Sequence, residues 1–140
     1  MTLKRIAVFG GRNYPHRSRV RSALFRLLMK HGAFVVVHGA CNCGDDEPDI
    51  GADWFAHEWA LDQVDVGVVE EPHPARWSEH GRAAGPIRNR EMATSGLDGA
   101  VEFPGGRGTA SMRRECDDAG VSVWKPTAWN AVIGGEGEPF

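Results

Sequence analysis

Apolar runs that end at glycine or proline alternate along the chain with segments whose apolar residues are spaced by three and four. The short runs predict five strands, over residues 4–9, 33–37, 66–69, 97–103 and 121–124. The longer segments predict four helices, over residues 16–31, 52–64, 86–95 and 108–119. Because strands alternate with helices, we expect an α/β fold, a Rossmann-like three-layer domain. Its mostly parallel five-stranded sheet should have the order 3-2-1-4-5.

Glycine, proline and threonine mark the expected helix ends. Gly32 is the expected C-cap of the first helix. Gly85 is the expected N-cap of the third helix, with Pro86 at its first position. Thr109 is expected to cap the fourth helix. Residues 70–84, which contain two prolines and a glycine before Gly85, predict a long loop.

The composition is that of a folded chain rather than a disordered one, with 41% hydrophobic and 25% charged residues among 140. We expect one domain over residues 1–126 with an acidic insert at 40–51, and a loosely ordered tail at 127–140. No apolar run approaches the roughly 20 residues of a membrane span. The first run is too short for a signal peptide, and the cysteines do not suit a disulfide framework. These features predict a cytoplasmic protein.

Charge is distributed unevenly along the sequence. Residues 1–44 hold eight Lys or Arg and no Asp or Glu, whereas residues 45–75 hold ten Asp or Glu and no Lys or Arg. This split favours either a nucleic-acid-binding face or oppositely charged elements that lie against each other. We expect mostly the second, as two adjacent helices or as matched faces of two subunits. Arg12 differs from the other early basic residues because it directly follows a glycine turn at a strand end.

Unusual residues are concentrated in the loops that follow the first four strands, where ligands bind in open parallel sheets. Glycines there allow close approach to a ligand, and the helix behind them directs N–H groups at an anion. The segment Pro104–Thr109 is the stronger phosphate signal, because three glycines and a threonine exceed the needs of a turn. It matches neither a Walker A loop nor the dinucleotide glycine pattern.

Four motifs together resemble the YspA-type family of the SLOG superfamily over residues 4–125. They are Gly10-Gly11-Arg12, His38-Gly39-Ala40 with Gly51-Ala52-Asp53, the run from Gly81 to Asn89, and Pro104-Gly-Gly-Arg-Gly-Thr109. The resemblance implies a Rossmann-like nucleotide-binding domain and a homodimer or higher homo-oligomer. Relatives in this superfamily include Lonely Guy phosphoribohydrolases, sensors of nucleotide signals, and Smf/DprA proteins, which bind single-stranded DNA.

The resemblance leaves the question of catalysis open. The phosphoribohydrolases carry an Arg-Lys-x-x-Met motif, and here Arg88 and Met92 are kept but Asn89 replaces the lysine. The family's catalytic glutamate position is Met112, which can neither take a proton nor stabilise a ribosyl cation. If the chain is an enzyme, the candidate catalytic residues are Arg88 with a relocated carboxylate at Glu91 or Glu115.

Several candidate residues have a structural reading beside the functional one. Asp53 either binds a ribose hydroxyl or complements a helix dipole. Trp77 either stacks on a base or packs its loop onto the sheet. Arg88 is expected to contact phosphate rather than to be a plain surface charge. The insert with Cys41 and Cys43 is interpreted as a solvated acidic loop, so we predict no metal and no cofactor besides a bound nucleotide.

The sequence therefore predicts a protein that binds a nucleoside phosphate or an ADP-ribose-like ligand, as a sensor, carrier or sequestering protein. The alternatives are an N-glycosidase acting on nucleoside 5′-monophosphates and single-stranded DNA binding. The expected ligand-binding residues are Gly10, Gly11, Arg12, His38, Gly39, Ala40, Asp53, Trp77, Arg88, Asn89, Pro104, Gly105, Gly106, Arg107, Gly108 and Thr109.

Overall fold

A computed structural model describes residues 2–41, 50–126 and 140 of the chain. Five strands form one sheet in the order β3-β2-β1-β4-β5, and every neighbouring pair is parallel. This arrangement confirms the predicted fold class and strand order. The strands are β1 (Arg5–Phe9), β2 (Val35–His38), β3 (Val69–Pro72), β4 (Gly99–Glu102) and β5 (Val123–Trp124).

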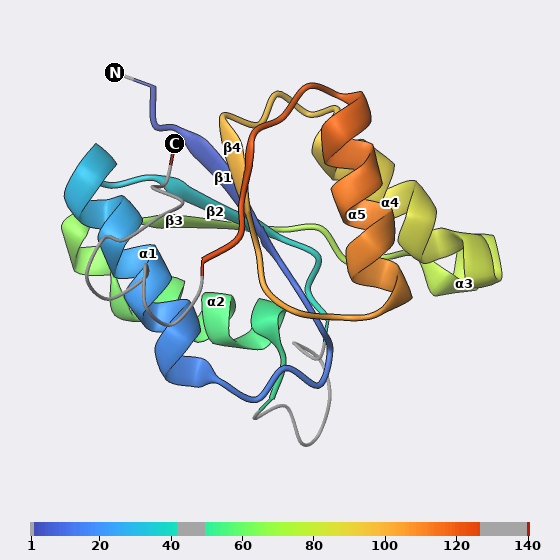
Figure 1. Cartoon of the computed structure of the whole chain (residues 1–140), viewed down its shortest axis with the longest axis horizontal. Helices are drawn as coiled ribbons and strands as arrows, with labels where there is room; N and C mark the ends of the chain where they lie inside the picture. The colour runs from blue at the N-terminus through green and yellow to red at the C-terminus, as the bar shows by residue number, and fades with distance from the viewer. Residues whose placement is uncertain (1, 42–49, 127–139) are drawn as a thin grey trace.

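Helices cover both faces of the sheet (Figure 1). On one face lie α1 (Arg17–His31) and α2 (Ala52–Asp62), and on the other lie α4 (Ala84–Ala93) and α5 (Arg107–Asp118). The short helix α3 (Trp77–His80) precedes α4 and extends beyond the sheet (Figure 1). Two 3₁₀ turns, η1 (Val64–Val66) and η2 (Gly81–Ala83), complete the described elements.

The core consists of two apolar layers because successive strand residues point to opposite faces of the sheet. Ile6 and Val8 of β1 belong to the layer that includes Trp59 and other residues of α1 and α2. Ala7 and Phe9 belong to the opposite layer, which includes Met92, Met112 and Cys116 of α4 and α5. Cys116 is fully buried, as a small apolar core residue is expected to be.

The uneven charge distribution has a structural explanation in the packing of α1 against α2. Arg17 donates to Glu58 at 3.0 Å, and Arg21 donates to Asp62 at 3.0 Å. Both pairs join the basic first helix to the acidic second helix. The expectation of two adjacent helices of opposite sign is therefore confirmed for these residues.

The third strand lies further along the chain than predicted. The range 66–69 was wrong for most of its length, because residues 64–66 form η1 and Gly67 ends it with a φ of 96°. The strand instead begins at Val69 and pairs with β2 through two glutamates. Glu70 and Glu71 do not fit an apolar strand pattern, and their polar partners on neighbouring elements explain why they lie in the sheet.

Two predicted helix starts also differ from the structure. Helix α4 begins at Ala84, so Gly85 lies inside the helix rather than at its N-cap. Helix α5 begins at Arg107 with Gly106 as N-cap, and Thr109 lies in its first turn without capping it. The predicted long loop contains α3 and η2. The C-cap at Gly32 is confirmed, with its N–H donating to the Leu28 carbonyl at 2.8 Å.

The predicted insert and tail fall largely outside the described residues. These include the predictions for Cys43, for the solvated acidic loop and for a loose tail over residues 127–139. Phe140 is described, and its carbonyl oxygen lies 2.6 Å from Nε2 of His31 at the end of α1. Within the described ranges, no helix combines the length and the apolar character that a bilayer crossing requires.

Candidate ligand-binding site

A cavity of about 800 Å³ opens at the carboxyl ends of β1 and β4. The strand order runs outward in opposite directions from β1 and β4. Ligands bind beside such a reversal in doubly wound sheets. Its lining includes every expected ligand-binding residue except His38 and Ala40. The residues that the structure brings together are Gly10, Gly11, Arg12, Gly39, Asp53, Trp77, Arg88, Asn89, Pro104, Gly105, Gly106, Arg107, Gly108 and Thr109.

The glycine turns after β1 and β4 contact each other at the base of the cavity. The Gly11 N–H donates to the Pro104 carbonyl at 2.9 Å. A Cβ atom on Gly105 would lie 2.0 Å from Oγ1 of Thr109 and 2.6 Å from the Gly11 nitrogen. A Cβ on Gly10 would lie 2.8 Å from that of Ala52 at the start of α2. Glycine is therefore required at both turns by the packing of the backbone itself.

The two helices that begin at the cavity offer different electrostatic environments. At α2, the Ala52 N–H donates to the Gly11 carbonyl at 3.1 Å, and the buried carboxylate of Asp53 lies in the first turn. At α5, no acidic residue lies in the first turn. The N–H groups of residues 107–109 have no acceptor within the described part of the chain. Of these two helix starts, the start of α5 is therefore the one whose N–H groups and charge suit an anion.

Arg88 joins the loop after β2 to helix α4. Its Nε–H donates to Oδ1 of Asn89 at 2.9 Å, and its Nη1 donates to the carbonyls of Gly39 and, at 3.2 Å, His73. Nη2 lies 4.0 Å from Sγ of Cys41. The guanidinium therefore borders the cavity with most of its donors already directed at the protein.

Asn89 connects the two helices that carry the phosphate-type motifs. The side chain is buried, and Nδ2 donates to the Gly108 carbonyl at 3.4 Å and to Oγ of Ser111 at 3.3 Å. Both acceptors belong to the first turns of α5. Asn89 thus joins α4 to α5 through its side-chain amide and supplies no cation.

Asp53 and Cys41 form the polar wall opposite α5. Oδ2 of Asp53 accepts the Cys41 N–H at 3.0 Å, and both residues line the cavity. Burial raises the pKa of the Cys41 thiol, and the neighbouring Asp53 carboxylate raises it further. The thiol is therefore held in its protonated form, which is a poor nucleophile.

The candidate catalytic carboxylates are not brought to the cavity. Glu91 is exposed on α4 and borders a separate small hollow with Arg76. Glu115 is half-buried on α5, one turn beyond Met112, which lines the cavity floor. Glu115 lies one turn further along the helix than Met112, and it does not line the cavity. Among the described residues, Asp53 is the only carboxylate that lines the cavity.

His38 and Ala40 differ most from the sequence expectation. The His38 side chain is fully buried, and its Nε2 lies 2.7 Å from Oε2 of Glu70. Nδ1 of the same ring accepts the Ala40 N–H at 3.0 Å. The imidazole therefore points away from the cavity, and Ala40 contacts that ring instead of the cavity.

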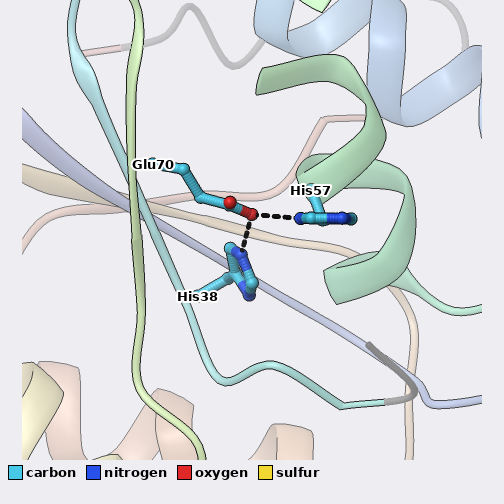
Figure 2. Close-up of side chains that lie close together, drawn as sticks. All are labelled: His38, His57 and Glu70. Atoms are coloured by element: carbon cyan, nitrogen blue, oxygen red, sulfur yellow. Dashed lines mark hydrogen bonds and ion pairs between the residues drawn. The ribbon is translucent and has the colours of Figure 1, made fainter. Parts of the chain in front are cut away.

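Oε2 of Glu70 accepts a second hydrogen bond, from Nδ1 of His57 in α2, at 2.5 Å (Figure 2). Burial raises the pKa of Glu70, but the hydrogen bonds from His38 and His57 outweigh it, so the pKa lies below the ordinary glutamate range. The motifs gave no sign of this cluster.

Comparison with known proteins identifies a relative of this chain. No family model matches the sequence. The gene 61 protein of Mycobacterium phage D29 is 36% identical over 124 residues, which cover 86% of this chain and 94% of the phage protein. The chain belongs to the family of that phage protein.

A solved structure supports the fold of this gene 61 family member. The Moco carrier protein from Chlamydomonas reinhardtii has a similar fold, with a TM-score of 0.55 and 16% sequence identity. The match covers 95% of this chain and 86% of that protein. The similarity supports the Rossmann-like α/β fold of this chain.

Apolar lining residues in this gene 61 family member were not among the predicted site residues. Tyr14, Met92 and Phe9 lie beside the glycine turns and give the cavity a largely apolar floor. Trp77, of which 53% is exposed, stands at the edge near Gly85. Phe9 directly precedes Gly10 and Tyr14 follows it by four residues, so the positions of both beside the first glycine turn could have been predicted.

Proposed function

We propose that this protein binds a nucleoside phosphate or an ADP-ribose-like ligand as a carrier, sensor or sequestering protein. The observation that carries the proposal is the start of α5, where amides without acceptors in the described ranges face a cavity at the strand ends. Its motifs support assignment to the YspA-type branch of the SLOG superfamily. The carrier role in the name of the structural neighbour is consistent with binding.

The proposed pose follows from the charges around the cavity. The ligand phosphate lies against residues 106–109 with the exposed Arg107 beside it. The buried Asp53, at the other end, accepts hydroxyl groups of the ribose. Trp77 offers an aromatic face for the base. The apolar floor with Met112 suits the uncharged part of such a ligand.

Binding is favoured over hydrolysis because the cavity offers no glutamate among its described residues. Met112 fills the position where the phosphoribohydrolases carry their acid, and Glu91 and Glu115 lie outside the lining. A nucleotide N-glycosidase needs a carboxylate that stabilises the ribosyl cation or moves a proton. Asp53 sits at the other wall and is engaged by the Cys41 N–H.

The first test is titration calorimetry with AMP, ADP and ADP-ribose, alongside mass spectrometry of any nucleotide released on denaturation. We expect one of these ligands to bind. R107A should weaken binding by about tenfold, the equivalent of one charge-assisted hydrogen bond. R114A is a matched control, because Arg114 is exposed on the same helix and does not line the cavity.

Three results would contradict the proposal. Absence of binding to every nucleotide tested would reject the ligand class. Release of free adenine from AMP would show an N-glycosidase instead. Binding to single-stranded DNA that weakens steeply with salt and is equal in R107A would favour a nucleic-acid role.

A further inference from the structure

Outside the cavity lies a cluster of His38, His57 and Glu70, from β2, α2 and β3 (Figure 2). One oxygen, Oε2 of Glu70, contacts both imidazoles, and the candidate ligand atoms all lie within 4.8 Å of one another. Two histidines and a glutamate are a known ligand set for zinc. The hydrogen bonds of His38 decide between a metal site and another role.

The proton position on His38 follows from its two neighbours. The Ala40 N–H can only donate, so Nδ1 of His38, at 3.0 Å, must be an unprotonated acceptor. The neutral ring then carries its proton on Nε2 and donates it to Glu70 at 2.7 Å. A metal bound at Nε2 would require that proton to move to Nδ1, where it would face the Ala40 N–H. This geometry argues against a metal at His38.

The backbone of Ala40 has an unfavourable conformation at the point where its N–H binds His38. Its φ of 59° is in the left-handed region, which residues with a Cβ rarely adopt. Among the described residues it is the only one other than glycine with a positive φ. The strained conformation coincides with the hydrogen bond to His38, so the ring acts as the support of this turn.

The turn from Gly39 to Cys41 forms hydrogen bonds with two charged side chains that line the cavity. Gly39 supplies the carbonyl that accepts from Nη1 of Arg88. Cys41 supplies the N–H that binds Oδ2 of Asp53. Ala40 lies between them. The position of Arg88 and of Asp53 is therefore linked to the Ala40 conformation by one hydrogen bond on each side.

We infer that Glu70 and His38 form a positioning relay, in which Glu70 fixes the His38 tautomer and His38 fixes the turn that holds Arg88 and Asp53 at the cavity. His57 donates a second hydrogen bond to the carboxylate of Glu70. Neither Glu70 nor His38 lines the cavity. The expected effect on nucleotide binding rests on the proposed function. The effect of Glu70 on the His38 tautomer and on the turn does not require a ligand.

The direct test is NMR of protein labelled with ¹⁵N in histidine and in the backbone, with no nucleotide present. We expect His38 to be neutral, with Nε2 protonated and Nδ1 unprotonated. E70A should weaken the preference for this tautomer, because only the Ala40 N–H then favours it, and should shift the Ala40 amide resonance. E71A is the matched control on the same strand, because Glu71 contacts Arg5 and His73 rather than His38.

A pair of His38 variants separates the two hydrogen bonds in binding. H38N keeps an acceptor near Nδ1 for the Ala40 N–H but does not reach Glu70. H38Q reaches Glu70 but leaves the Ala40 N–H without its acceptor. With AMP as the probe, we expect H38Q to weaken binding by about tenfold and H38N by less than about threefold.

The outcomes distinguish this inference from the proposed function. Failure of AMP, ADP and ADP-ribose to bind would reject the function, while the NMR result would still decide the relay. A His38 ring protonated at Nδ1 would overturn the relay. One Zn²⁺ bound per chain and lost in H57A would also overturn it, because the cluster would then be a metal site. Equal effects of H38N and H38Q would show that the turn does not depend on Nδ1.

Discussion

Gly39 and Arg88 are the pair of residues on which the cavity wall depends most directly. A Cβ on Gly39 would lie 2.5 Å from Nη1 and 2.7 Å from Cζ of Arg88. A long side chain normally moves aside at little cost. Here Nη1 also donates to the carbonyls of Gly39 and His73, so movement of the guanidinium breaks those contacts. Because Gly39 has no Cβ, the guanidinium of Arg88 can occupy the space that a Cβ would fill.

We predict that G39A lowers the free energy of unfolding by about 1–2 kcal/mol, because the Arg88 hydrogen bonds are lost. The shorter R88K side chain removes the clash together with the guanidinium. The double variant G39A/R88K should therefore be more stable than the sum of the single effects indicates. Urea denaturation of the four proteins measures the coupling. Strictly additive effects would contradict the contact.

At the scale of elements, the turns after β1 and β4 form one unit. The Gly11 N–H binds the Pro104 carbonyl at 2.9 Å, and Gly105 packs against the Gly11 backbone. Each turn sets the position of the helix that follows it. The open N–H groups of α5 therefore face the cavity because the backbone of the first turn lies directly against the second.

We predict that G105A is severely destabilising, by about 3 kcal/mol or more, because its Cβ would meet backbone at 2.6 Å and the Thr109 hydroxyl at 2.0 Å. G106A is the matched control in the same turn, because a Cβ there meets nothing within 4 Å. Thermal unfolding should give a large decrease in Tm for G105A and little change for G106A. Similar Tm values would show that the turns do not touch.

Element order and the position of the cavity could be predicted from the sequence because they depend on local patterns. The apolar runs and the glycine turns report on their own segments. The true range of β3 could not be predicted, because Glu70 and Glu71 enter the sheet through partners distant in sequence. For the same reason the burial of His38 was hidden. Its motif suggested a ligand contact, whereas its partner is 32 residues away.

At the scale of the whole molecule, charge contributes to stability across element boundaries. The ion pairs of Arg17 with Glu58 and Arg21 with Asp62 join the two helices of one layer, but they are partly exposed and contribute little. Glu70 of the edge strand is less exposed than either acid of those pairs, and Glu70 and Glu71 together accept hydrogen bonds from β1, β2 and α2. The acid response of the fold should therefore depend on these two glutamates.

Both glutamates have a pKa below the ordinary range. For Glu71 the main cause is the hydrogen bond from Arg5, partly opposed by burial. For Glu70, burial is the largest single effect and raises the pKa, but the hydrogen bonds from His38 and His57 together lower it by more. A carboxyl with a lowered pKa in the folded state stabilises the fold at pH values above its unfolded pKa. That contribution is lost as the pH falls through the folded-state pKa, because the unfolded chain binds the proton first.

We predict that E70Q is less stable than the wild type by about 2 kcal/mol at pH 7, the scale of a hydrogen bond to a charged group. The difference should shrink below about pH 4.3, where the unfolded-state glutamate takes up its proton, and nearly vanish once the folded-state carboxyl is protonated as well. Urea denaturation between pH 7 and 3 measures both curves. E91Q is the control, since Glu91 is exposed on α4 and should leave the pH profile unchanged. A stability difference between E70Q and wild type that stays constant down to pH 3 would show that the Glu70 carboxylate is not held by its two histidines.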